Sequence, residues 1–115
     1  MKKKVLFLFV ILTMMCSSSA NASTLIMQGI IKVITDVDND FHYAEVRLIR
    51  DNGTYILTLY CPSLNAGGDN EYSTINSSQM EYYCIEVCDI HNANYPSAPQ
   101  LYFAGFQNYT WFEQI

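Results

Sequence analysis

Basic side chains are scarce in this chain once its first 22 residues are set aside. Only Lys32, Arg47 and Arg50 then remain against eleven acidic residues, which gives residues 23–115 a net charge near −8. Nucleic acids and anionic lipids are bound by clustered lysine and arginine. We therefore expect no nucleic-acid partner and no electrostatic attachment to anionic lipid.

Long apolar runs are also missing, because the longest run, Val5 to Met15, is well short of the roughly 20 residues that span a bilayer. This run follows three lysines and precedes a small-residue segment that ends in Ala20-Asn21-Ala22. That order is typical of a secretory signal peptide. We predict a signal peptide over residues 1–22, a mature chain from Ser23, no transmembrane segment and a secreted or periplasmic location. Lipidation of Cys16 is the alternative for this segment.

Recognisable catalytic patterns are absent. The chain has two histidines, His42 and His91, and neither lies in a Gly-x-Ser-x-Gly or papain-like cysteine context. Paired carboxylates need only meet in space, so the sequence does not test them. We expect a nonenzymatic protein without a cofactor.

Two clusters bear a partial likeness to metal sites. Asp36, Asp38 and Asp40 have the spacing that begins a calcium loop, but Phe41 stands where an EF-hand needs glycine and Arg47 where it needs glutamate. An exposed acidic turn is the better interpretation.

The second cluster holds Cys84, Cys88, Asp89 and His91, whose side chains suit a soft metal. No second Cys/His pair completes a set of four ligands, and an oxidising compartment tends to consume thiols. We expect no bound metal.

Residues typical of β-strands dominate the rest of the chain. We expect strands over residues 25–34, 41–49, 54–61, 82–90 and 101–106, with a sixth over the aromatic tail. Residues 62–70 and 91–99 are expected to be loops, and residues 73–81 to hold a short helix with Thr74, Asn76 or Ser78 as its cap. Asn52-Gly53 is the strongest hairpin signal.

The order of these elements predicts one small domain over residues 23–115. Three strands, a possible short helix and two or three further strands match an OB-like barrel, and an antiparallel β-sandwich would give nearly the same order. We predict an all-β fold of five to six strands, with one short helix at most.

Three cysteines remain in the predicted mature chain. On one extended strand, Cys84 and Cys88 would be about 13 Å apart, which is too far for a disulfide. Cys61 is therefore expected to pair with Cys84, with Cys88 as the alternative partner.

Aromatic residues are the most suggestive feature, with nine tyrosines and one tryptophan. Tyr and Trp provide rigid amphipathic area for stacking on sugars or for protein contacts. The segments Asn92 to Tyr95 and Asn108 to Trp111 place such rings beside asparagines. We expect ligand binding by Tyr95, Tyr109 and Trp111, although the same rings could instead fill a small core.

The run from Gly29 through the Asp36 to Asp40 turn into Phe41 to Val46 resembles the first hairpin of Shiga-toxin-like B subunits. Those proteins are small secreted OB-fold proteins that form pentamers and bind host glycans. The likeness covers about a fifth of the chain, and the cysteine count departs from that family's single pair. The resemblance implies a glycan-binding or toxin-delivery module and a homo-oligomer.

These observations predict a secreted binding module for a glycan or a protein. The alternative is a periplasmic inhibitor or assembly accessory protein whose acidic surface covers a basic partner.

Overall fold

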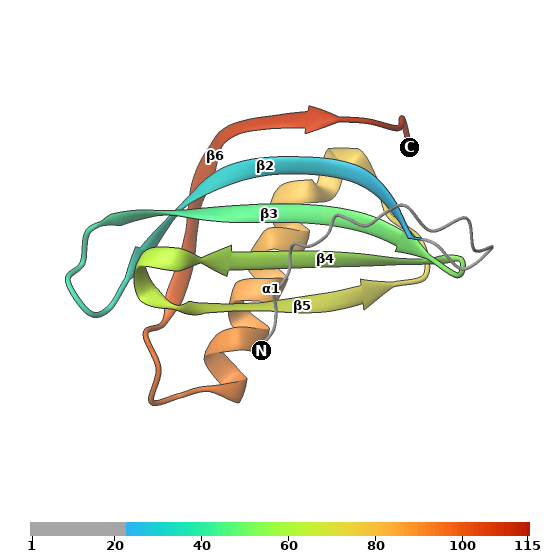
Figure 1. Cartoon of the computed structure of the whole chain (residues 1–115). Helices are drawn as coiled ribbons and strands as arrows, with labels where there is room; N and C mark the ends of the chain where they lie inside the picture. Colours follow the sequence, from blue (N-terminus) through green and yellow to red (C-terminus); the bar gives the residue numbers. More distant parts are fainter. Residues whose placement is uncertain (1–22) are drawn as a thin grey trace.

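The computed structural model describes residues 23–115, so the predicted signal peptide lies outside the described residues. One antiparallel sheet runs in the order β5-β4-β3-β2-β6 and is crossed on one face by a helix, α1 (Figure 1). The elements are β2 (Thr24–Thr35), β3 (Phe41–Asp51), β4 (Thr54–Cys61), η2 (Pro62–Leu64), β5 (Ala66–Tyr72), η3 (Ser77–Gln79), α1 (Met80–Asn94) and β6 (Leu101–Trp111).

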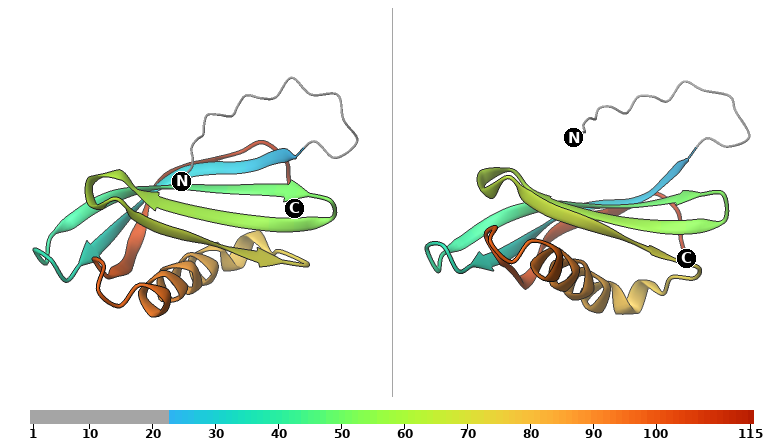
Figure 2. Two further views of the ribbon diagram at one scale, coloured as in Figure 1. Left: turned by 60° about the horizontal axis from the view of Figure 1, so that its bottom comes forward. Right: turned by 90° about the horizontal axis from the view of Figure 1, so that it is seen from below.

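The predicted fold class, a β-rich domain of five to six strands with a short helix, is confirmed. The five strands form one curved layer, and α1 lies against one face of it (Figure 2). Strands β5 and β6 are the two edges of the layer, and the pairings within residues 23–115 do not join them. The expected closure into a barrel is therefore not part of the pairing pattern.

The Asn52-Gly53 hairpin is confirmed. Asn52 and Gly53 have φ values of 53° and 81°, and they connect β3 to β4 beside the Asp51–Thr54 pair. A two-residue type I′ turn needs positive φ at both central positions, which Asn and Gly tolerate best. The sequence therefore fixes the register of these two strands.

The predicted strand over residues 82–90 is wrong, because these residues form the middle of α1. Its buried side chains recur at intervals of three and four residues, the period of a helix rather than of a strand. They are Met80, Tyr83, Cys84, Val87, Cys88 and His91. The helix follows η3, where the Asn76 side chain accepts a hydrogen bond from the Ser78 N–H at 3.0 Å. Asn76 is thus one of the caps expected from the sequence.

The predicted loop over residues 62–70 is also partly wrong, since β5 begins at Ala66. Gly67 and Gly68 lie within this edge strand, where glycine usually marks a close approach. At Gly67, a Cβ atom would collide with the backbone of Leu59 and Tyr60 on β4. The glycine pair therefore permits close strand pairing instead of breaking it.

The core lies between α1 and the sheet face that it covers. Alternate residues of the central strands point toward the helix and are fully buried, among them Ile31, Val33, Val46, Leu48 and Leu57. Burying one such side chain contributes roughly 1.5–3 kcal/mol. Within residues 23–115, no helix has the length and apolar character needed to cross a membrane.

Candidate functional site

Strand β6 carries a row of four aromatic rings on the face that looks toward α1. Successive rings pack edge to face, with centroids 5.5, 5.5 and 6.4 Å apart. The four residues are Phe103, Phe106, Tyr109 and Trp111. The residues are three, three and two positions apart, which a regular strand would distribute over both faces. Register shifts between Ile30 and Ile31 and between Lys32 and Val33 insert extra β6 residues and bring the rings to one side.

Gly29 on β2 provides the space beneath this row. A Cβ atom at Gly29 would lie 2.5 Å from the Asn108 carbonyl oxygen and 2.8 Å from the Tyr109 Cβ. Because Gly29 pairs with Tyr109, only glycine allows β6 to approach β2 this closely. The position of Tyr109 therefore depends on Gly29.

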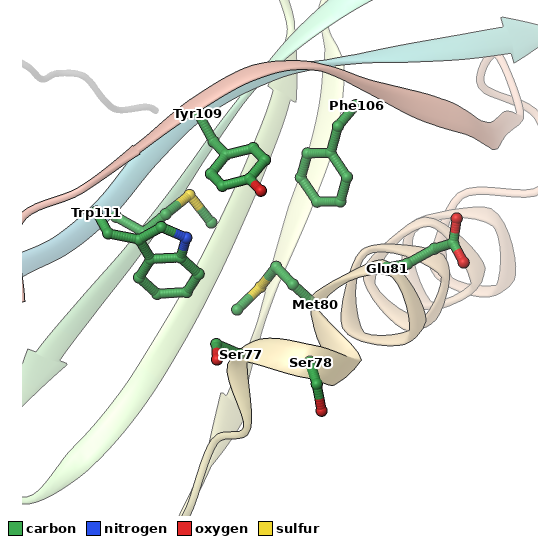
Figure 3. Close-up of a pocket in the computed structure, with 8 residues that line it drawn as sticks. Ser77, Ser78, Met80, Glu81, Phe106, Tyr109 and Trp111 are labelled. Atoms are coloured by element: carbon green, nitrogen blue, oxygen red, sulfur yellow. The ribbon is translucent and has the colours of Figure 1, made fainter. Parts of the chain in front are cut away.

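A hollow of about 270 Å³ separates the aromatic row from the start of α1. Phe106, Tyr109 and Trp111 form one wall, and residues from η3 and the first turn of α1 form the other (Figure 3). Met27 and Met80 are buried and also line the hollow. The site thus combines an aromatic wall with the polar residues Ser77, Ser78 and Glu81.

The polar wall is held in place by short-range hydrogen bonds. Ser78 is fixed by its N–H and its hydroxyl, which donate to the Asn76 side-chain oxygen at 3.0 and 2.8 Å. Among the hydrogen bonds of the described residues, the Ser77 hydroxyl takes part in none. Ser77 therefore offers both a donor and an acceptor to a molecule in the hollow.

A second hollow of about 420 Å³ adjoins the first at Ser77 and Trp111. Its remaining lining comes from the end of the chain, Phe112 to Ile115. This tail is anchored at two points: the Phe112 N–H donates to the Ile26 carbonyl at 2.8 Å, and Arg50 forms an ion pair with Glu113 at 2.7 Å. Trp111 is thus shared by two neighbouring hollows.

Two of the three predicted ligand-binding residues, Tyr109 and Trp111, meet at this site. Tyr95 does not, because it is the C-cap of α1, at the opposite end of the helix, and its ring centroid lies 5.5 Å from that of His91. The sequence reasoning missed the opposite wall entirely. Ser78 and Glu81 fit a capping box, which indicates the start of a helix but not what that helix start faces, and Ser77 gave no signal.

The three cysteines are buried free thiols in the described residues. The predicted Cys61–Cys84 disulfide is therefore not present, and neither is the alternative with Cys88. The argument that kept Cys84 and Cys88 apart assumed a strand. On a helix these two positions have Cβ atoms about 5–6 Å apart, which still exceeds the roughly 3.5–4.5 Å of a disulfide.

Burial weakens the acidity of the helix thiols. Desolvation raises the pKa of Cys84 to about 12, with a smaller contribution from Cys88. It likewise raises the pKa of Cys88 to about 12, and Asp89 adds to the effect. A thiolate is the form that attacks electrophiles and binds metals, so these thiols are poor nucleophiles. Among the described residues, no group of three or more His, Cys, Asp or Glu side chains is arranged to hold a metal ion.

The acidic turn is organised by its own hydrogen bonds. Asp38 and Asp40 accept from the backbone N–H groups of Asp40 and Phe41 at 3.0 and 2.8 Å, and Asp36 accepts from the Gln100 N–H at 3.0 Å. The two local contacts are typical of an Asx-rich turn, and the third ties the turn to the residue before β6.

A Ser–His–Asp contact that the sequence did not reveal lies next to this turn. The His42 ring contacts Ser63 Oγ through Nδ1 at 2.8 Å and Asp38 Oδ2 through Nε2 at 2.9 Å. The hydrogen bond from His42 lowers the pKa of Asp38 below its usual value. These residues line neither hollow, and their hydrogen bonds tie η2 to the β2–β3 turn.

His91 closes the opposite end of α1. Its ring is 4 % exposed and contacts two carbonyl oxygens, that of Gly67 at 3.1 Å and that of Pro99 at 2.8 Å. Asn92 next to it exchanges two hydrogen bonds with the Leu101 backbone. A neutral imidazole carries one N–H, so it can donate to one of these carbonyls. Together, His91 and Asn92 join this end of the helix to both edge strands.

Comparisons of the chain with protein-family models, with curated proteins and with solved structures found no match. The function must therefore be argued from the site.

Proposed function

We propose that this protein is a secreted, nonenzymatic module that binds a glycan in the hollow between β6 and the start of α1. The proposal rests on the two walls of this hollow, which has a volume of about 270 Å³. One wall is aromatic (Phe106, Tyr109 and Trp111), and the other is polar (Ser77, Ser78 and Glu81). Secretion is supported by the cationic, apolar and small-residue order of residues 1–22.

The chemistry of a sugar ring matches the two walls. A pyranose has an apolar C–H face that packs on an aromatic ring, and its edge carries hydroxyls that donate and accept hydrogen bonds. Binding sites of this kind are mostly apolar and use a few placed polar groups for orientation. Tyr109 is 55 % exposed, so a ligand can reach its ring without displacing core residues.

A glycan array probed with the full-length protein, expressed and secreted by a bacterial host, tests the proposal. We expect Trp111→Ala to weaken binding to any hit by at least about tenfold, which corresponds to about 1.4 kcal/mol. Tyr95→Ala is the control, because it removes an exposed ring at the other end of α1 that lines neither hollow. Its binding should equal that of the unmodified protein.

Thermal melts of both variants must show intact folding before the affinities are compared. A screen without a glycan hit at micromolar protein concentration would count against the proposal. Equal binding by the Trp111→Ala protein would place the site elsewhere.

A second candidate function follows from the charge. Eleven acids against three basic residues in residues 23–115 give the surface of an inhibitor or accessory protein for a basic partner. Such binding would weaken steeply as salt is added, because exposed charges are screened within about 8–10 Å at physiological ionic strength. Stacking on Trp111 would be much less sensitive to salt.

A further inference from the structure

The two hollows on β6 adjoin at the same pair of residues. Trp111 and Ser77 line both, so a molecule in one hollow touches the wall of the other. The Ser77 hydroxyl, without a partner among the described hydrogen bonds, stands at this junction. The arrangement suits a ligand of two linked units that meet at Trp111.

The size of each hollow limits what one unit can be. Their volumes are about 270 and 420 Å³, whereas sites for larger organic ligands extend to about 1,000 Å³. Both hollows lie near the lower end of the range of small-molecule sites, which begins at roughly 300 Å³. We therefore assign one small unit, such as a sugar ring, to each hollow.

The charges that line the hollows are acidic only. Glu81 lines the first and Glu113 the second, and neither lining includes a lysine, arginine or histidine. Arg50, which contacts Glu113, is held by both carboxylate oxygens at 2.7 and 3.1 Å. Glu113 is thus neutralised by Arg50, whereas the lining of the first hollow has no basic residue to neutralise Glu81. A sugar with a carboxylate or sulfate would therefore meet like charge at Glu81.

Uncharged hydroxyls, in contrast, find partners in both hollows. Glu81 accepts hydrogen bonds in the first hollow, Ser77 donates and accepts at the junction, and the Gln114 amide does both in the second. The Trp111 indole N–H adds a donor at the junction. The polar lining is thus complementary to neutral hydroxyl groups.

We propose that the ligand is an uncharged oligosaccharide with one ring in each hollow, and that its two rings meet at Trp111. This inference rests on the proposed function, because it concerns the same site. It adds the charge class of the ligand and its minimum length.

Titration calorimetry with a fixed panel tests both additions. The neutral probes are lactose, maltose, cellobiose and chitobiose with their monosaccharides, and the charged probes are 3′-sialyllactose and a sulfated heparin disaccharide. We expect at least one neutral disaccharide to bind about tenfold more tightly than its monosaccharide. Neither charged probe should bind as tightly as that disaccharide.

Three variants assign the two rings to the two hollows. Phe112→Ala alters only the second hollow and should reduce disaccharide affinity to that of the monosaccharide. Tyr109→Ala alters only the first and should weaken both probes. Glu81→Lys should raise the affinity for 3′-sialyllactose relative to lactose by at least about fivefold. The Phe112 side chain is 58 % exposed, and its backbone anchor to Ile26 remains in the variant.

The two proposals fail differently. Binding that depends on Trp111 but shows no gain from the second ring, or no preference for neutral probes, overturns this inference and leaves the glycan function standing. An absence of binding by the whole panel and by the glycan array overturns both.

Discussion

An exposed tyrosine lies near each end of α1, but the two ends differ in what surrounds that ring. Tyr109 at the first end and Tyr95 at the second are 55 % and 57 % exposed, so exposure does not distinguish them. At the first end, aromatic rings face polar groups across open space. At the second, the side chains of His91, Asn92 and Gln100 form hydrogen bonds with backbone carbonyl groups.

This difference makes the first end a candidate binding site and the second end a structural contact. A polar group with a fixed protein partner contributes to stability, whereas one that faces a hollow beside exposed rings remains available to a ligand. We therefore expect loss of a hydrogen-bonded side chain at the second end to lower stability, and loss of an exposed ring at the first end to act mainly on binding.

The largest expected effect concerns the thiols that lie along α1 between the two ends. A pKa of about 12 instead of 9.0 for Cys84 and Cys88 lowers the thiolate fraction roughly a thousandfold near neutral pH. Iodoacetamide at pH 8 should modify them very slowly in the native protein and rapidly in urea. Mass spectrometry of the digested protein measures each site. Rapid modification of either cysteine would show that one end of the helix opens, and a nonreducing map with a bond to Cys61 would contradict the free thiols.

His91→Leu should cause the largest loss of folding stability. The substitution removes the ring N–H that donates to the Gly67 or the Pro99 carbonyl and leaves that acceptor without its partner in a buried region. We expect a loss of about 3 kcal/mol, since an unsatisfied buried polar group costs about 1–3 kcal/mol. Urea denaturation measures it, with Tyr95→Leu as the control at the same end. A loss below about 0.5 kcal/mol would mean that this end is not closed by His91.

Gly29→Val should disturb the packing of β6 against β2 at the first end. The added side chain would collide with Asn108 and Tyr109 on β6, and overpacking of this kind costs about 1–3 kcal/mol. Displacement of Tyr109 should also weaken glycan binding. Gln28→Ala, at the exposed neighbouring position, is the control. If the Gly29→Val protein equals the control in stability and binding, the position of Tyr109 does not depend on Gly29.

The smallest effect is expected at the β2–β3 turn, which belongs to neither end. His42 lowers the pKa of Asp38, so the Asp38 carboxylate contributes to folding stability. This contribution is complete above the usual pKa of 3.8 and is lost as the pH falls through the lowered pKa. His42→Phe should therefore be slightly less stable than the unmodified protein at pH 6. The difference should shrink on acidification to pH 2, as followed by urea midpoints at each pH. A difference that does not change with pH would assign the effect to packing.

Much of the sheet could be predicted from local chemistry. Strands β3 and β4 are found close to their expected bounds because Asn52-Gly53 fixes the turn and β-branched residues fill the strands. The helix was mistaken for a strand because Tyr82, Ile85 and Val87 favour strands locally. The pattern of Met80, Tyr83, Val87 and His91 could have revealed it, since these positions share one face only in a helix.

The candidate site was predictable only in part. An aromatic tail beside asparagines indicates a binding surface at Tyr109 and Trp111, and the structure places both residues in the wall of one hollow. The same pattern equally indicated Tyr95, because the sequence does not show that the Tyr95 ring lies next to His91.

The sequence by itself determined the turns, most of the strands, the acidity of the surface and the aromatic tail, because each follows from a few neighbouring residues. Only the tertiary structure decided that α1 lies across the sheet and that two bulges turn the rings of β6 to one face. These features depend on pairing between Gly29 and Tyr109, some 80 positions apart in the chain. Contacts at that separation are set by how whole elements pack, so no local pattern records them.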